Sequence, residues 1–210
     1  MKLASAMVGA LLLASAGCGK DDAAAVHSNG RTVLERAKDD PEVLGSVAPF
    51  HFTSSDSRTV TEHDLLGKVW VVDFFFTTCS GPCPRITTQM RALQDDLAGS
   101  SVQLVSISVD PATDTPEALR DYAERVGADT SRWWFLTGDE TATDDLIRSS
   151  FALPVEHASG AQIGFQVSHS TKLVVVDARG KVRGYYAGET PEGRAMARER
   201  AQWLAQHLDS

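Results

Sequence analysis

The sequence predicts an α/β fold in which a central mixed β-sheet is flanked by helices. Three observations lead to this prediction: apolar runs of strand length, helical spacing of apolar residues between them, and two late strand-like runs around a turn signal. The 210 residues, 42% of them hydrophobic, suffice for one globular domain with appendages. A net charge of -8 without a basic stripe argues against a nucleic-acid-binding protein. The sequence has no heptad repeat that would indicate a coiled-coil oligomer, so we expect a monomer.

The N-terminal residues have the features of a targeting segment. Lys2 gives a positive start, residues 4–14 form an apolar run too short to span a bilayer as a helix, and small residues precede Cys18. This arrangement resembles a bacterial lipoprotein signal over residues 1–17, with Cys18 acylated as the first mature residue. An ordinary signal peptide cleaved near Ala16 is the alternative. The protein is then exported, and a lipid anchor on Cys18 would hold it at the membrane, facing the periplasm or the cell exterior.

A tether and a folded domain are expected after the targeting segment. Residues 18–44 are rich in Ala and Asp and predict the tether, with one short helix over 32–38. Residues 45–210 form the predicted domain. Its first clear element is residues 70–76, whose Val and Phe side chains are typical of a central strand buried on both faces.

The later elements continue the alternation of helices and strands. Pro84 opens a helix, because a first-turn residue needs no amide donor, and Gly99 ends it. The remaining elements are a strand over 102–109, a helix over 115–126, a short strand over 133–136, a helix over 141–151, strands over 172–177 and 181–186 around the turn Ala178-Arg179-Gly180, and a helix over 192–208. Asp110 and Asp114 are interpreted as turn and capping residues, with Asp114 or Thr115 as N-cap. This order of elements is that of the thioredoxin fold.

Cys79 and Cys83 lie where the strand over 70–76 passes into the helix that Pro84 opens. Helix amides and the helix dipole stabilise a thiolate there and lower its pKa, so we expect Cys79 to be the more reactive thiol. Cysteines four residues apart at a helix start can share a disulfide or a metal ion. A purely structural disulfide is the alternative, although a bridge that closes so small a loop would stabilise the fold little.

A third donor, His169, is expected beside the cysteines. It precedes the strand over 172–177, and in the thioredoxin fold this junction packs against the cysteine loop. Thiol oxidoreductases of that fold place a cis-proline there, whereas this chain has no proline between Pro154 and Pro191. Two thiolates favour soft ions such as Cu(I) or Zn, and an added imidazole suits copper in either oxidation state. A hydrogen-bonding surface histidine is the alternative.

Asp73 is an acidic residue within the strand that leads to the cysteines. A carboxylate in an apolar strand has its pKa raised by desolvation and could relay protons to the thiols during exchange. A carboxylate hydrogen-bonded in the core for local reasons is the alternative. The segment 72–83 resembles the thioredoxin active-site region with one residue inserted between the cysteines.

Motifs distributed over most of the predicted domain match those of one known family. They are residues 76–84 with the pattern Cys-x-x-x-Cys-Pro, 108–115 with Asp-Pro-x-x-Asp-Thr, 136–138, 169–170 and 177–180. On these residues the chain resembles the Sco/SenC family, thioredoxin-like copper proteins linked to cytochrome c oxidase assembly. The resemblance implies copper, as Cu(I) or Cu(II), held by Cys79, Cys83 and His169. It also implies delivery of copper to the binuclear copper site of oxidase subunit II or another acceptor, or reduction of the thiols of that site.

Two other functions stay open at this point. The insert Ser80-Gly81-Pro82 and the acid Asp73 are typical of thioredoxin, which favours an extracytoplasmic thiol-disulfide oxidoreductase. Its catalytic residues would be Cys79, Cys83 and Asp73, and a thiol redox partner would be required. A peroxidase of the peroxiredoxin type uses the same fold, but its signature needs a proline where Val72 stands.

Overall fold

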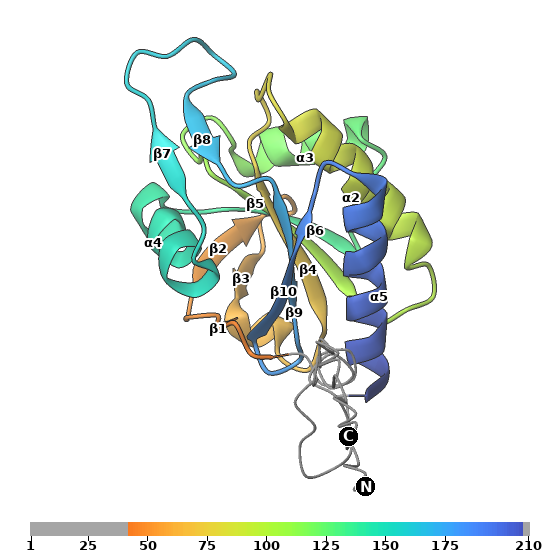
Figure 1. Ribbon diagram of the computed structural model, residues 1–210. Helices are drawn as coiled ribbons and strands as arrows, with labels where there is room; N and C mark the ends of the chain where they lie inside the picture. Colours follow the sequence, from red (N-terminus) through yellow and green to blue (C-terminus); the bar gives the residue numbers. More distant parts are fainter. Residues whose placement is uncertain (1–41, 208–210) are drawn as a thin grey trace, which may run out of the picture. The chain divides into compact units, whose positions relative to one another are not determined.

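The structure of the protein is a computed structural model that describes residues 42–207. The predicted signal peptide over 1–17, the lipid-modified Cys18 and most of the predicted tether lie outside the described residues. The described part of the chain forms an eight-stranded sheet, a two-stranded sheet and helices that pack on the larger sheet (Figure 1). No helix within residues 42–207 is long and apolar enough to cross a membrane.

The centre of the larger sheet is mixed, as predicted. β4 (Trp70–Phe75), β5 (Gln103–Ser108) and β6 (Trp133–Thr137) run parallel, and β9 (Lys172–Val176) pairs antiparallel with β4. Every residue of β4 is buried, because the strand has a neighbour on each side and helices on each face. β9 and β10 (Lys181–Ala187) form the predicted hairpin.

The sheet edges carry short strands that the sequence analysis does not predict. β1 (Gly45–Ser46) pairs with β10, and β2 (His51–Ser54) pairs with both β6 and β3 (Thr59–Thr61). A 3₁₀ helix, η1 (Glu62–Leu65), follows β3. These strands are two to four residues long, which is too short for a periodic pattern to be read from the sequence.

The helices of the described residues begin and end close to their predicted bounds. They are α2 (Cys83–Asp96), α3 (Pro116–Arg125), α4 (Glu140–Phe151) and α5 (Pro191–His207). Phe74 and Phe75 point to opposite faces of β4: Phe74 packs edge-on against Phe151 of α4, and Phe75 contacts Tyr122 of α3. Tyr122 and Thr87 of α2 share a hydrogen bond of 2.7 Å. Helices α2 and α3 therefore lie side by side on the face opposite α4 (Figure 1).

A second sheet of two strands lies outside the larger one. β7 (Val155–His157) and β8 (Val167–His169) pair antiparallel, with Val155 opposite His169. In Figure 1 this hairpin projects at the upper end of the molecule, where α2 begins. The hairpin is absent from the sequence-based prediction, and it ends at the predicted third donor.

Candidate metal centre

The loop between β4 and α2 holds Cys79 and places Cys83 at the first residue of α2. Pro82 is the N-cap residue, and Pro84 occupies the second helical position, where a missing amide hydrogen costs nothing. No acidic residue lies in the first turn of α2. The positive end of the helix dipole therefore faces the cysteines without local neutralisation.

Asp114 anchors the start of the cysteine loop. It is fully buried, and it accepts hydrogen bonds from the amide and hydroxyl of Thr77 and from the hydroxyl of Ser108. Of the two predicted N-cap candidates, Asp114 and Thr115, Asp114 is therefore not the cap of the following helix. The N-cap of α3 is Thr115, whose hydroxyl oxygen accepts from the amide of Ala118 at 3.3 Å. Burial raises the pKa of Asp114, although the hydrogen bonds from Ser108 and Thr77 oppose that shift.

His169 lies at the end of β8 with its ring aimed at the cysteines. Its Nδ1 lies 2.9 Å from the carbonyl oxygen of Ser170. A carbonyl can only accept, so Nδ1 carries the hydrogen and the neutral ring presents the lone pair of Nε2. That Nε2 lies 3.3 Å from the Sγ of Cys83. The edge-on ring of Phe76, 5.9 Å away between centroids, packs against the imidazole.

The three predicted ligands come together. The Sγ atoms of Cys79 and Cys83 and a ring nitrogen of His169 all lie within 4.8 Å of one another. Within residues 42–207, no other group of three or more His, Cys, Asp or Glu side chains brings its ligand atoms this close together. Two sulfurs and one oriented imidazole form a donor set suited to copper or zinc, so the chemistry of these residues fits the predicted ion.

The two thiols differ in exposure and in acidity. Cys79 is half-buried and Cys83 is buried. The hydrogen bond from the Cys83 thiol lowers the pKa of Cys79 to about 4, with further help from His169 and the amides of Gly81 and Cys83. The same hydrogen bond and burial raise the pKa of Cys83. Cys79 is therefore the thiolate of the pair, as the position before the helix predicts.

Asp73 is buried on β4, and Ser106 is the residue paired with it on β5. The hydroxyl of Ser106 donates to the Asp73 carboxylate, and the indole of Trp133 donates to the Ser106 oxygen at 2.8 Å. Burial raises the pKa of Asp73 to about 6, while Ser106 and the nearby His169 lower it in part. The negative charge of Asp73 in turn contributes to the raised pKa of Cys83.

Two residues of the loop between β7 and β8 attach the hairpin to the cysteine loop. The Nε2 of Gln166 donates to the hydroxyl of Thr78 at 3.1 Å and to the carboxylate of Asp110 at 2.9 Å. The amide of Ser80 donates to the carbonyl of Gly164 at 3.1 Å. Gly164 has a φ of +94°, and a Cβ there would clash with the Ser80 hydroxyl and the Thr78 carbonyl, so any other residue would be strained at this position. Gln166 and Gly164 belong to no motif, so no sequence pattern predicts their role.

The remaining histidines of the described residues lie elsewhere. His51 is on β2, His63 is in η1, His157 pairs with Asp144 at 3.1 Å, and His207 stacks on Trp203. None of them belongs to the three-ligand cluster. The sequence-based choice of His169 among these candidates is therefore consistent with the geometry.

The comparisons with known proteins agree with this arrangement. A family model described as SCO1/SenC matches residues 38–205. The chain belongs to the SCO1/SenC family. The resemblance inferred from the short motifs is thereby confirmed, and so is the thioredoxin-like α/β fold of the Sco proteins.

Solved structures of SCO1/SenC proteins superpose on most of this chain. A SCO1/SenC family lipoprotein from Bacillus anthracis str. Ames is 34% identical with a TM-score of 0.71, over 79% of this chain and 98% of the other. BsSco, described as a member of the Sco family of cytochrome c oxidase assembly proteins with a disulfide switch, is 32% identical with a TM-score of 0.67, over 78% and 96%. ScoI of Bradyrhizobium japonicum, solved with copper bound, is 25% identical with a TM-score of 0.59, over 74% and 99%.

Proposed function

We propose that this chain binds copper through Cys79, Cys83 and His169 and passes it to the binuclear copper site of cytochrome c oxidase subunit II or to another copper acceptor. The observation that carries the proposal is the convergence of two sulfurs and the Nε2 of His169 within 4.8 Å. The copper-bound ScoI relative and the assignment of BsSco to an oxidase assembly family support it.

Each residue of the site has a part in copper transfer. Cys79 is already a thiolate at neutral pH, and binding of copper releases the proton of Cys83, because a bound thiol is deprotonated. The hydrogen bond to the Ser170 carbonyl keeps the imidazole of His169 in the tautomer that can bind a metal. Since Cys83 is buried and Cys79 is half-buried, an acceptor ligand would reach the copper from the Cys79 side.

Copper uptake by the reduced protein tests this function. Titration with Cu(I) against a competing chelator should give one tightly bound copper ion per chain. Cys79→Ser and Cys83→Ser should each lose this binding, because a hydroxyl is a poor ligand for a soft ion. Transfer to an acceptor is then measured by mixing the loaded protein with the reduced, copper-free domain of oxidase subunit II. Equal copper binding by the wild type and both serine variants would rule the proposal out.

A thiol-disulfide reductant is the second function that specific observations favour. Cys79 is an accessible thiolate beside a buried partner thiol, and the buried Asp73 has its pKa raised to about 6. These features suit a dithiol that reduces the cysteines of a copper acceptor. The role requires both Cys79 and Cys83, and reductase activity that survives replacement of either would exclude it. If the Asp73 carboxyl transfers protons to and from the thiols, Asp73→Asn should slow thiol-disulfide exchange near neutral pH.

The N-terminus supports a proposed location outside the cytoplasm. We propose that residues 1–17 are a lipoprotein signal, that Cys18 carries the lipid, and that residues 18–44 tether the domain of residues 45–210 to the membrane surface. The family relative from Bacillus anthracis is itself described as a lipoprotein. Metabolic labelling with a tritiated fatty acid should mark the wild type and leave Cys18→Ala unlabelled. Incorporation of the label into Cys18→Ala would contradict the assignment.

A further inference from the structure

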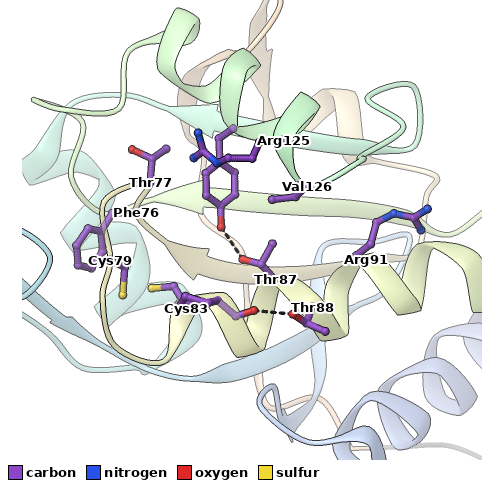
Figure 2. A pocket seen from close by; sticks show the side chains of 11 residues that line it. Phe76, Thr77, Cys79, Cys83, Thr87, Thr88, Arg91, Arg125 and Val126 are labelled. Atoms are coloured by element: carbon purple, nitrogen blue, oxygen red, sulfur yellow. Dashed lines mark hydrogen bonds between the residues drawn. The ribbon is translucent and has the colours of Figure 1, made fainter.

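A groove between α2 and α3 reaches the two thiols from the side that lacks His169. It is a cavity of about 430 Å³, lined by both cysteines, by Phe76 and Thr77, and by residues of the two helices. Figure 2 shows the two sulfur atoms at one end of the row of lining side chains and Arg91 at the other. The hollow lined by His169 is a different one, of about 240 Å³, between the cysteine loop and β8. The thiols therefore have a second approach besides the metal side.

The charge of this groove is opposite to that of the protein. When Cys79 and Cys83 form a disulfide, the charged lining residues of the groove are Arg91 and Arg125, and no described acidic residue lines it, although the chain has a net charge of -8. The guanidinium of Arg125 lies over the ring of Tyr122 at 5.0 Å and makes no ion pair with a described residue. Arg91 pairs with Asp95 one turn further along α2, a partly exposed pair of the weak kind that a ligand carboxylate can share. The groove is therefore suited to an anion.

The spacing of the lining residues limits the length of the occupant. Cys83, Thr87 and Arg91 follow one another at intervals of four residues and so form a stripe on one side of α2. Eight residues of helix rise about 12 Å, which is the length of three or four residues of extended peptide. A cavity of about 430 Å³ is also in the range of small-ligand sites. The apolar side chains of Tyr122, Val126 and Pro84 line the space between the thiols and the arginines.

We propose that this groove binds a short peptide thiol with carboxylate groups, which reduces the Cys79–Cys83 disulfide after the protein has been oxidised. The inference rests on the proposed function, because the cysteines must be reduced before they can hold copper. The carboxylates would lie towards Arg91 and Arg125, and the sulfur would lie against Cys79.

The reduction proceeds by two thiol exchanges. The thiolate of the first peptide attacks the Sγ of Cys79, which is the more exposed sulfur; the disulfide breaks, and Cys83 leaves as a thiolate that takes up a proton. A second peptide thiolate attacks the sulfur of the bound peptide, which releases Cys79 and forms the peptide disulfide. Two electrons pass from two peptide thiols to one protein disulfide.

Reduction rates with a charged and an uncharged form of the same thiol test the proposal. The oxidised protein is mixed with reduced glutathione, which has two carboxylates, or with its diethyl ester, and rates are compared per thiolate. The acidic protein as a whole should repel glutathione and favour the ester. The groove predicts the reverse: glutathione should react roughly three- to tenfold faster, the range that one or two partly exposed ion pairs supply. Added salt should reduce this preference.

Variants assign the preference to the groove. Arg125→Gln should reduce the ratio, and the double variant Arg91→Gln with Arg125→Gln should abolish or reverse it, while the rate with the ester stays the same. Arg179→Gln is the matched control, because Arg179 is an exposed arginine in the turn between β9 and β10. A wild-type ratio of one or less, or an unchanged ratio in the double variant, would overturn the proposal.

Copper binding by the same variants separates this inference from the proposed function. The reduced double variant should bind Cu(I) as the wild type does, because neither arginine belongs to the three-ligand cluster. If the reduced wild type did not bind Cu(I), this result would count against the proposed function alone. A missing preference for glutathione with intact copper binding would count against the groove alone.

Discussion

The cysteine loop and the hairpin of β7 and β8 both contribute ligands to the candidate site, but different contacts hold them in place. Cys79 and Cys83 follow a completely buried strand and begin a helix, and the carboxylate of Asp114 ties their loop to β5. His169 ends a three-residue strand of a separate two-stranded sheet. That hairpin meets the cysteine loop through a few hydrogen bonds of Gly164 and Gln166.

Because the two regions are attached differently, substitutions in them should have different effects. The cysteine loop is continuous with the core, so changes there should reduce the free energy of unfolding of the whole domain. Apart from its buried Val155 and Val167, the hairpin is attached by partly exposed polar contacts, so changes to those contacts should loosen His169 while the core stays intact.

Replacement of Asp114 should cost the most stability. Asp114→Ala leaves the amide and hydroxyl of Thr77 and the hydroxyl of Ser108 without their acceptor in a buried place. We expect a loss of about 4 kcal/mol in the free energy of unfolding, measured by urea denaturation. Asp139→Ala, which removes the cap of α4, is the control and should cost only about 1 kcal/mol. Similar losses for the two variants would contradict the anchoring role of Asp114.

The buried carboxyl of Asp73 should make stability depend on pH. Its pKa is raised by burial from 3.8 to about 6, so the folded state binds the proton more tightly than the unfolded state. Stability from this group is therefore fully present below pH 3.8 and is lost as the pH rises through 6. We expect Asp73→Asn to gain up to about 3 kcal/mol relative to the wild type between pH 4 and pH 7. Parallel pH profiles of the two metal-free proteins would contradict the prediction.

A matched pair of glycines tests the contact between the hairpin and the cysteine loop. Gly164 and Gly160 both have positive φ, but a Cβ at 164 would strike Ser80 and the Thr78 carbonyl, whereas one at 160 meets no atom within 4 Å. Gly160→Ala should therefore cost only the backbone strain, about 1 kcal/mol. Gly164→Ala should cost about 2 kcal/mol more, or release the hairpin from the loop. Hydrogen exchange at the Ser80 amide, which donates to Gly164, distinguishes the two variants, and equal protection in both would count against the contact.

The smallest expected effect is at Gln166. Gln166→Ala removes the hydrogen bonds to Thr78 and Asp110 and the one from the amide of Gly164. The first two join the hairpin to the rest of the domain, and their loss should weaken copper binding by about three- to tenfold. The urea midpoint should change little. Gln162→Ala, in the same loop and exposed, is the control for copper affinity. If Gln166→Ala instead lowers the unfolding free energy and leaves copper affinity unchanged, the hairpin belongs to the core and the contrast fails.

The same contrast explains what the sequence could and could not predict. Residues 70–76 are a continuous apolar run, and Pro84 is a clear helix start, so β4, α2 and the position of the cysteines follow from local pattern. β7 and β8 have three residues each, and their pairing depends on contacts far along the chain. His169 was found through the thioredoxin fold and the missing proline, whereas Gln166 and Gly164 have no local signature. Asp114 and Thr115 were both candidates for the N-cap, because either residue type caps helices; Thr115 is the cap, and the side chain of Asp114 binds Thr77 instead.

The most direct test of the account is the ligand set of the bound copper. X-ray absorption and, for Cu(II), electron paramagnetic resonance should show two sulfurs and one imidazole nitrogen in the wild type. His169→Ala should lose the nitrogen signal and bind copper more weakly, whereas the control His157→Ala, on the neighbouring strand, should match the wild type. Identical spectra and affinities for the wild type and His169→Ala would contradict the claim that the hairpin supplies the third ligand.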